Sequence, residues 1–181
     1  MSNRAIFLDR DGVINKAIVR EGKPYPPENL TQVEILPGVQ EALTLFKQAG
    51  FLLIVVTNQP DVARGTVDRS EVEAIHSALI ERLPLDEIMA CFHDNRDDCS
   101  CRKPKPGMLL AAADKWDIKL SESHMIGDRW RDVAAGVSAG CKTVFVDYGY
   151  DEKRPKTYDY QVKTLLEAAT LICHGRGEGN T

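Results

Sequence analysis

Short apolar runs recur along the chain, and segments with helical spacing of apolar positions lie between them. Continuous apolar runs are typical of strands buried on both faces, and they predict strands over residues 5–8, 51–56, 87–90, 124–126 and 143–146. Helical periodicity predicts helices over residues 39–48, 68–82, 107–116, 131–139 and 162–171. We expect Asp68 to cap the second helix, with Glu71 completing a capping box.

The alternation of strands and helices predicts an α/β fold. Such a pattern is typical of a parallel sheet covered by helices on both faces, here a three-layer, doubly wound arrangement. No insertion is large enough for a separate cap domain, so we expect one domain over residues 1–174 and a disordered tail over residues 175–181. Residues 15–37 are expected to form a long loop beside the first strand.

Polar residues follow three of the predicted strands directly. Asp9, Thr57 and Asp128 each lie at or just beyond a strand end. Ligands of open α/β sheets bind at the carboxyl ends of the strands, so these side chains can converge on one site. Three polar residues that merely begin loops are the alternative. Asp9 and Asp128 offer the oxygen ligands that Mg²⁺ prefers.

The residue types at these strand ends are those that phosphoryl transfer needs. Asp9 can attack a phosphorus atom and form an aspartyl-phosphate, while Asp11 can protonate the leaving oxygen and then activate water. Gly12 permits the sharp turn after the strand. Thr57 offers a hydroxyl to the phosphoryl oxygens, and Lys103 offers a positive charge to the transition state.

Three cysteines and a histidine cluster in one polar stretch. Cys91, His93, Cys99 and Cys101 form a full tetrahedral ligand set, which predicts a structural Zn²⁺ site, against the alternative of four unrelated loop residues. Arg102 follows the last of these ligands directly. We hypothesise that zinc stiffens the loop over residues 91–101, which then presents Lys103 to the phosphoryl group and Arg102 to the substrate.

Four segments together resemble the signature motifs of the haloacid dehalogenase superfamily. They are DRDGV at residues 9–13, TN at 57–58, Lys103 and GDRWRD at 127–132. The resemblance implies Asp9 as nucleophile, Asp11 as general acid and base, and Mg²⁺ held by Asp9, the Asp11 backbone carbonyl and Asp128. Further side chains are expected to bind substrate or phosphate, namely Asn58, Arg64, Arg102 and Arg129.

Within that superfamily, the chain is most similar to the branch that contains phosphatases of heptose bisphosphates and of histidinol phosphate. TNQ at residues 57–59, ARG at 63–65, the Cys/His loop and CRKP at 101–104 carry this similarity. GVIN at residues 12–15, ARG at 63–65 and PGMLL at 106–110 resemble the heptose-bisphosphate enzymes more, which favours removal of the 7-phosphate of a heptose bisphosphate. The short spacing between His93 and Cys99 is closer to the histidinol-phosphate enzymes. A polynucleotide 3′-phosphatase and a catalytically inactive metal-binding scaffold are further alternatives.

Composition narrows the range of partners and compartments. The formal net charge of −4 gives no general attraction to nucleic acid or anionic membranes, which weighs against a polynucleotide substrate. The resemblance implies a small phosphorylated sugar or amino alcohol as substrate. No apolar run approaches the roughly 20 residues that span a bilayer, and the N-terminus lacks a secretory pattern. We therefore expect a cytoplasmic protein. We expect a monomer because the sequence shows no long exposed apolar stripe.

Overall fold

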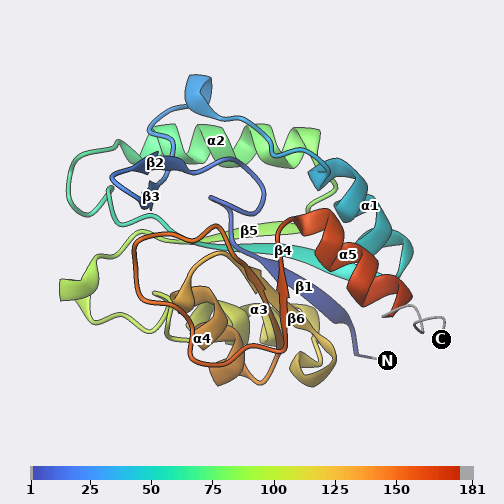
Figure 1. The fold of residues 1–181 in the computed structure, drawn as a ribbon. Helices are drawn as coiled ribbons and strands as arrows, with labels where there is room; N and C mark the ends of the chain where they lie inside the picture. The colour runs from blue at the N-terminus through green and yellow to red at the C-terminus, as the bar shows by residue number, and fades with distance from the viewer. Residues whose placement is uncertain (1, 176–181) are drawn as a thin grey trace.

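The computed structural model describes residues 2–175, and a six-stranded sheet runs through its centre (Figure 1). The strand order is β5-β4-β1-β6-β7-β8, and every pairing is parallel. The strands are β1 (Arg4–Leu8), β4 (Phe51–Asn58), β5 (Glu87–Cys91), β6 (His124–Gly127), β7 (Lys142–Val146) and β8 (Tyr160–Val162). The winding direction reverses between β1 and β6, which is where open α/β sheets bind their ligands.

Five helices cover the two faces of this sheet. They are α1 (Val39–Gln48), α2 (Arg69–Arg82), α3 (Gly107–Trp116), α4 (Trp130–Ala139) and α5 (Leu165–His174). Figure 1 shows α1, α2 and α5 on one side and α3 and α4 on the other. Strand β1 feeds both cores, because Ile6 and Leu8 pack under the first group while Ala5 and Phe7 pack under the second. The expected three-layer, doubly wound fold is thereby confirmed.

The segment expected as a long loop contains a hairpin. Strands β2 (Ile18–Arg20) and β3 (Lys23–Tyr25) pair antiparallel, with Glu21 and Gly22 between them at positive φ of 50° and 75°. Two positive φ angles are typical of a type I′ turn, for which Asn-Gly is the usual sequence marker. Glu21-Gly22 lacks that marker, and Pro24 argues against a strand. The apolar pattern therefore missed the hairpin.

Two predicted features of the helices are wrong. Helix α5 begins at Leu165 rather than 162, because Val162 pairs with Val146 in the missed edge strand β8 and Thr164 caps the helix by accepting the Glu167 N–H at 3.1 Å. Asp68 is the N-cap of α2, but its side chain makes no capping hydrogen bond, so the capping box is absent.

The remaining short elements are 3₁₀ turns at Leu30–Gln32, Asn95–Asp97 and Leu120–Glu122. Across residues 2–175 neither a cap domain nor a helix with the length and apolarity to cross a membrane is present. The expected disordered tail, apart from Gly175, lies outside the described residues.

Helix α4 packs on the sheet so closely that one of its positions must be glycine. A Cβ on Gly136 would lie 2.6 Å from Met125 Cβ and 2.9 Å from Thr143 Cγ2. Alanine normally stabilises a helix interior by about 1 kcal/mol relative to glycine. Here we expect Gly136→Ala to lower the free energy of unfolding by about 1–3 kcal/mol through overpacking, measured by urea denaturation.

Val137 provides the matched control on the same helix, because its side chain is 52% exposed. Val137→Ala should change the free energy of unfolding by less than about 0.5 kcal/mol. A Gly136→Ala protein as stable as the wild type would contradict the close packing of α4.

Candidate active site

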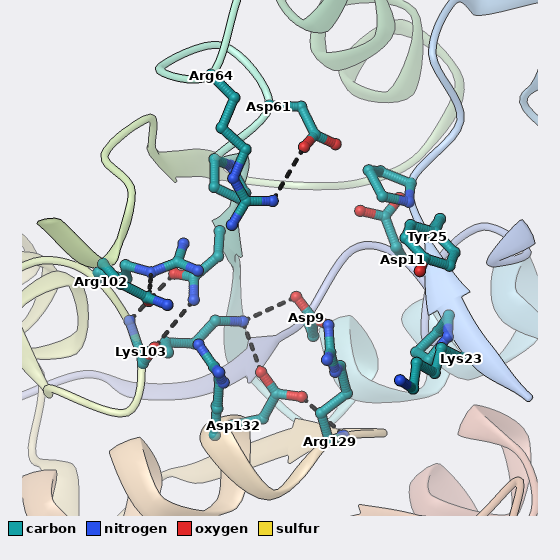
Figure 2. Close-up of a pocket in the computed structure, with 16 residues that line it drawn as sticks. Asp9, Asp11, Lys23, Tyr25, Asp61, Arg64, Arg102, Lys103, Arg129 and Asp132 are labelled. Atoms are coloured by element: carbon teal, nitrogen blue, oxygen red, sulfur yellow. Dashed lines mark hydrogen bonds and ion pairs between the residues drawn. The ribbon is translucent and has the colours of Figure 1, made fainter. Parts of the chain in front are cut away.

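A cavity of about 230 Å³ opens at the carboxyl ends of β1 and β4 (Figure 2). Most of the predicted site residues line it, although they come from separate parts of the chain: Asp9, Asp11, Asn58, Arg64, Arg102, Lys103 and Arg129. Thr57 and Asp128 are not part of the lining, and both are almost fully buried, at 1% and 2% exposed. The strand-end pattern thus located one site, with two of its members beneath the surface.

Asp9 lies at the floor of this cavity among charged groups. Its Oδ1 accepts a hydrogen bond from Lys103 Nζ at 2.8 Å. Carboxylate oxygens of Asp9, Asp128 and Asp132 all lie within 4.8 Å of one another. Burial, followed by the negative charge of Asp132, raises the pKa of Asp9 to about 6 although Lys103 acts against this rise. The cluster therefore holds more negative charge than its lysine balances.

Lys103 is buried and is held at three points. Its Nζ donates to the Val56 carbonyl at 2.6 Å, in addition to its bond with Asp9, and forms an ion pair with Asp132 Oδ1 at 2.7 Å. Burial alone would lower the pKa of this ammonium, but the charges of Asp132 and Asp9 raise it above its ordinary value. Lys103 is therefore a permanent cation beside the Asp9 carboxylate.

Asp128 has a buried carboxylate without a partner. Within residues 2–175, neither of its carboxylate oxygens has a hydrogen-bond partner. Burial and the nearby charge of Asp9 raise its pKa well above the ordinary value. Gly12, at φ 90°, makes room for it, because a Cβ there would lie 2.0 Å from Asp128 Oδ2. An orphaned buried carboxylate of this kind fits a cation ligand.

Asp11 is held by a network that the sequence did not predict. Its carboxylate accepts hydrogen bonds from Arg10 Nε, Asn15 Nδ2 and Gln59 Nε2, each at 3.0 Å. Gln59 Nε2 also donates to Thr57 Oγ1 at 2.9 Å, so one amide connects two predicted catalytic side chains. Arg10 and Asn15 are close to Asp11 in the chain, whereas Gln59 is forty-eight residues away and is brought to it by the fold.

Asn58 clamps the loop that carries the lysine. Its Oδ1 accepts the Lys103 N–H at 3.1 Å, and its Nδ2 donates to the Lys103 carbonyl at 3.0 Å. The side chain was expected to bind substrate, but these contacts engage it with the backbone of Lys103. Asp132 similarly positions its neighbours, because Oδ2 accepts the Arg129 N–H at 3.0 Å.

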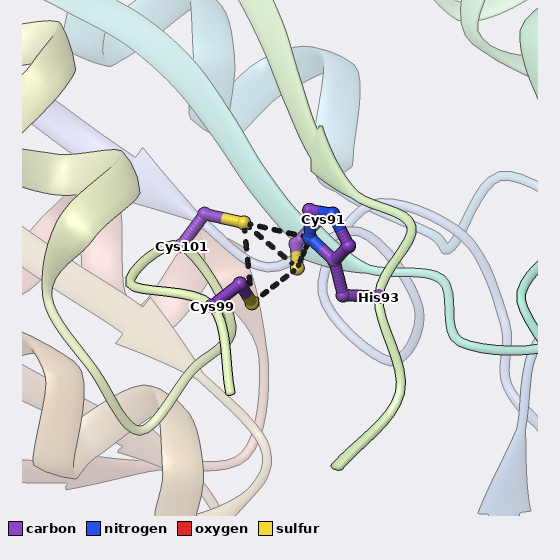
Figure 3. Close-up of side chains that lie close together, drawn as sticks. All are labelled: Cys91, His93, Cys99 and Cys101. Carbon is purple, nitrogen blue, oxygen red and sulfur yellow. Dashed lines mark hydrogen bonds between the residues drawn. The ribbon is translucent and has the colours of Figure 1, made fainter. Parts of the chain in front are cut away.

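The predicted metal ligands Cys91, His93, Cys99 and Cys101 come together (Figure 3). Distances among the sulfurs and His93 Nδ1 run from 3.0 Å to 3.7 Å. A tetrahedral ion with bonds of about 2.3 Å would separate sulfur ligands by about 3.8 Å, which is near these values. Burial, followed by the hydrogen bond with Cys101, raises the pKa of the Cys91 thiol. The donor set fits Zn²⁺.

The predicted arginines surround the cavity mouth with different degrees of pairing. Arg64 forms ion pairs with Asp61 and Asp94, at 3.2 Å and 2.8 Å. Arg129 is paired with Glu152 at 2.5 Å.

Within the described residues, the acceptors of Arg102 are neutral, because its Nε donates to Asn95 Oδ1 at 2.9 Å and its Nη1 donates to the His93 carbonyl at 3.2 Å. Lys105 lies outside the lining of this cavity and is paired with exposed Asp98.

Several lining residues had no place in the sequence-based site. Lys23 and Tyr25 come from the missed hairpin, and Figure 2 shows them across the cavity from Arg102. Arg131, on the first turn of α4, also lines the cavity. Its position in the GDRWRD segment was visible in the sequence, but no residue spacing distinguished it from a surface arginine.

Known proteins share both this fold and this sequence. A family model described as HAD-hydrolase-like matches residues 100–168. A D-glycero-beta-D-manno-heptose-1,7-bisphosphate 7-phosphatase from Helicobacter pylori is 35% identical over 177 residues, which cover 94% of this chain and 98% of the relative. The Escherichia coli K12 protein of the same name is 40% identical over 151 residues, covering 77% and 76%.

A solved structure extends the similarity to three dimensions. A D,D-heptose 1,7-bisphosphate phosphatase from B. bronchiseptica, complexed with magnesium and phosphate, superposes with a TM-score of 0.78. It is 29% identical, and the match covers 94% of this chain and 98% of that one. The chain therefore belongs to the haloacid dehalogenase-like hydrolase family, in the group that includes the heptose-bisphosphate phosphatases.

Proposed function

We propose that the protein is a Mg²⁺-dependent phosphatase that removes the 7-phosphate of D-glycero-D-manno-heptose 1,7-bisphosphate. The observation that carries this proposal is the position of Asp9, beside a buried lysine and an unpartnered carboxylate at the floor of an open cavity. Relatives that carry the name of this activity match nearly the whole chain. The cavity suits a small sugar phosphate rather than a polymer.

Asp9 and Asp11 divide the chemistry into two steps. In the first, an Asp9 oxygen bonds to phosphorus while the bond to the sugar oxygen breaks, and Asp11 gives its proton to that oxygen. In the second, Asp11 takes a proton from water, whose oxygen attacks the phosphorus and frees Asp9 and inorganic phosphate. Lys103 stabilises the charge that develops on the phosphoryl oxygens, and Thr57 supports them from the end of β4.

The acidic cluster provides the ligands for a magnesium ion. Asp9, Asp128 and the backbone carbonyl of Asp11 would hold Mg²⁺, because the Asp128 carboxylate is buried and otherwise unpartnered. When bound, the ion neutralises the charge that accumulates between the carboxylates and the incoming phosphate. Asp132 is occupied by Lys103 and by the Arg129 backbone, so it acts as a positioning residue.

A structural zinc ion in the Cys/His loop would fix the path of the chain up to Lys103. Cys101 is its last ligand, and Arg102 and Lys103 follow within two residues. Asn58 then fastens Lys103 to the end of β4. Zinc thiolates are typical of proteins from reducing compartments, which supports a cytoplasmic location.

Replacing the nucleophile tests the proposed reaction. Asp9→Asn should lower phosphate release from heptose 1,7-bisphosphate by at least about 10³-fold, because an amide cannot form the phosphoenzyme. Asp98→Asn is the matched control, since Asp98 is exposed, outside the main cavity, and in a left-handed conformation that asparagine also adopts. Its turnover should equal that of the wild type.

The same assay decides the substrate. Wild-type protein should prefer the heptose bisphosphate over histidinol phosphate and over 3′-phosphorylated DNA, measured as kcat/KM with Mg²⁺. Higher kcat/KM on histidinol phosphate would replace the substrate assignment while leaving the chemistry intact. An Asp9→Asn protein with full activity would refute the chemistry itself.

Removing two zinc ligands tests the role of the loop. Cys99→Ser with Cys101→Ser should abolish stoichiometric zinc in elemental analysis and lower the melting temperature, because the loop loses its metal cross-link. Turnover should fall at saturating Mg²⁺, since Lys103 is no longer held in place. Cys141→Ser, at a cysteine outside the cluster, should retain zinc. A double variant with wild-type melting and turnover would reject the role of the loop.

Protons should compete with Mg²⁺ at the acidic cluster. The pKa of Asp9 is raised to about 6, so this carboxylate binds a proton below that pH and must release it to bind metal. The Mg²⁺ dissociation constant should therefore rise at least about tenfold per pH unit below pH 6, and the raised pKa of Asp128 adds to this dependence. Isothermal titration calorimetry at pH 5, 6 and 7.5 measures this. Equal affinity at pH 5 and pH 7.5 would contradict the assigned ligands.

A further inference from the structure

The cavity wall holds more positive charge than the proposed hydrolysis uses. Five cationic side chains line it outside the catalytic lysine: Lys23, Arg64, Arg102, Arg129 and Arg131. Two are neutralised by acids, because Arg64 pairs with Asp61 and Arg129 pairs with Glu152. The other three lack a carboxylate partner anywhere in residues 2–175. This surplus of positive charge indicates that the cavity binds an anionic ligand.

Arg131 is the most informative of the three. Its Nε is buried and lacks a hydrogen-bond partner in the described part of the chain. A buried donor without an acceptor is costly unless a ligand provides one. The guanidinium lies 5.1 Å from the centre of the Trp130 ring, and this cation–π contact holds it in place.

Arg102 and Arg131 are close enough to repel each other. Burial first, and then the positive charges of Arg102 and Arg129, lower the pKa of Arg131. Two guanidiniums that line the same cavity, have unused donors and lack a carboxylate partner in the described residues are suited to binding a phosphate dianion. The proposed hydrolysis does not explain Arg131, because the cation that contacts Asp9 is Lys103.

We propose that Arg131, together with Arg102, binds the second phosphate of a bisphosphate substrate, the one that is not transferred. The inference rests on the proposed phosphatase function and adds to it the residue that selects bisphosphates over monophosphates. It gives the GDRWRD segment a second task, because Asp128 faces the acidic cluster while Arg131 faces the substrate cavity.

The test compares a bisphosphate with the monophosphate that lacks the second phosphate group. We would measure kcat/KM of the holoenzyme for heptose 1,7-bisphosphate and for heptose 7-phosphate, in wild type, Arg131→Gln and Lys23→Gln. Lys23 is the matched control, because it is another cation without a carboxylate partner in the described residues, but it lies across the cavity on the hairpin (Figure 2). Arg131→Gln should lower the ratio of the two kcat/KM values at least tenfold, mainly through KM.

Lys23→Gln should leave that ratio within threefold of the wild type. An unchanged ratio in Arg131→Gln would overturn the proposal. Equal losses of kcat/KM on both substrates would also overturn it, because they would place Arg131 at the transferred phosphate. Equal effects of Arg131→Gln and Lys23→Gln would overturn it as well, because they would indicate only the general electrostatic field of the cavity.

Binding without turnover separates this inference from the proposed function. In an Asp9→Asn background, calorimetry with the same two ligands should show that Arg131→Gln weakens the bisphosphate at least tenfold more than the monophosphate. If the wild type hydrolyses neither sugar phosphate, the proposed function fails, and the binding difference still decides the second phosphate site. If hydrolysis proceeds but bisphosphate and monophosphate bind equally, the inference fails and the hydrolase stands.

Discussion

The structure depends on burying three carboxylates around one ammonium. Asp9, Asp128 and Asp132 lie within reach of a common ion, and Lys103 is the cation bonded directly to two of them. Burying unbalanced charge costs several kcal/mol per ion, which is why burial raises the pKa of both Asp9 and Asp128. Two negative charges remain when all three acids are ionised, and a divalent cation has the charge that balances them. The cluster is therefore complete only with a metal.

Placing Lys103 in this cluster requires a loop with a defined path. The lysine does not lie on a strand, and it reaches Asp9 from ninety-four residues away along the chain. Two restraints act on the segment before it: the Cys/His cluster gathers residues 91–101, and Asn58 clamps the Lys103 backbone to β4. The two restraints together hold the Lys103 ammonium in a buried position that would be unfavourable without them. This gives a structural reason for the Cys/His cluster to lie so close in sequence to Lys103.

Several residues of the site can be identified from the sequence because the residues next to them in the chain mark their position. Asp9 and Asp128 follow apolar strands directly, so the parallel sheet itself predicts that they converge. The zinc ligands are clustered within eleven residues. In contrast, the Gln59 bridge between Thr57 and Asp11 depends on tertiary packing, and so does the double hydrogen bond of Asn58. The hairpin was missed because its turn uses Glu21-Gly22 and its second strand contains a proline.

The separation of negative charge at the cavity floor from positive charge at its mouth favours binding of the metal cation before the phosphate. The floor of the cavity carries an excess of carboxylates, and its mouth carries arginines and a lysine. A phosphate dianion is attracted to the mouth but repelled by the floor, and the repulsion is strong because the floor is shielded from water. Neutralising the floor removes that repulsion, so the cation must enter first. With the cation in place, the outer arginines and Lys103 attract the anion in one direction, toward the Asp9 carboxylate.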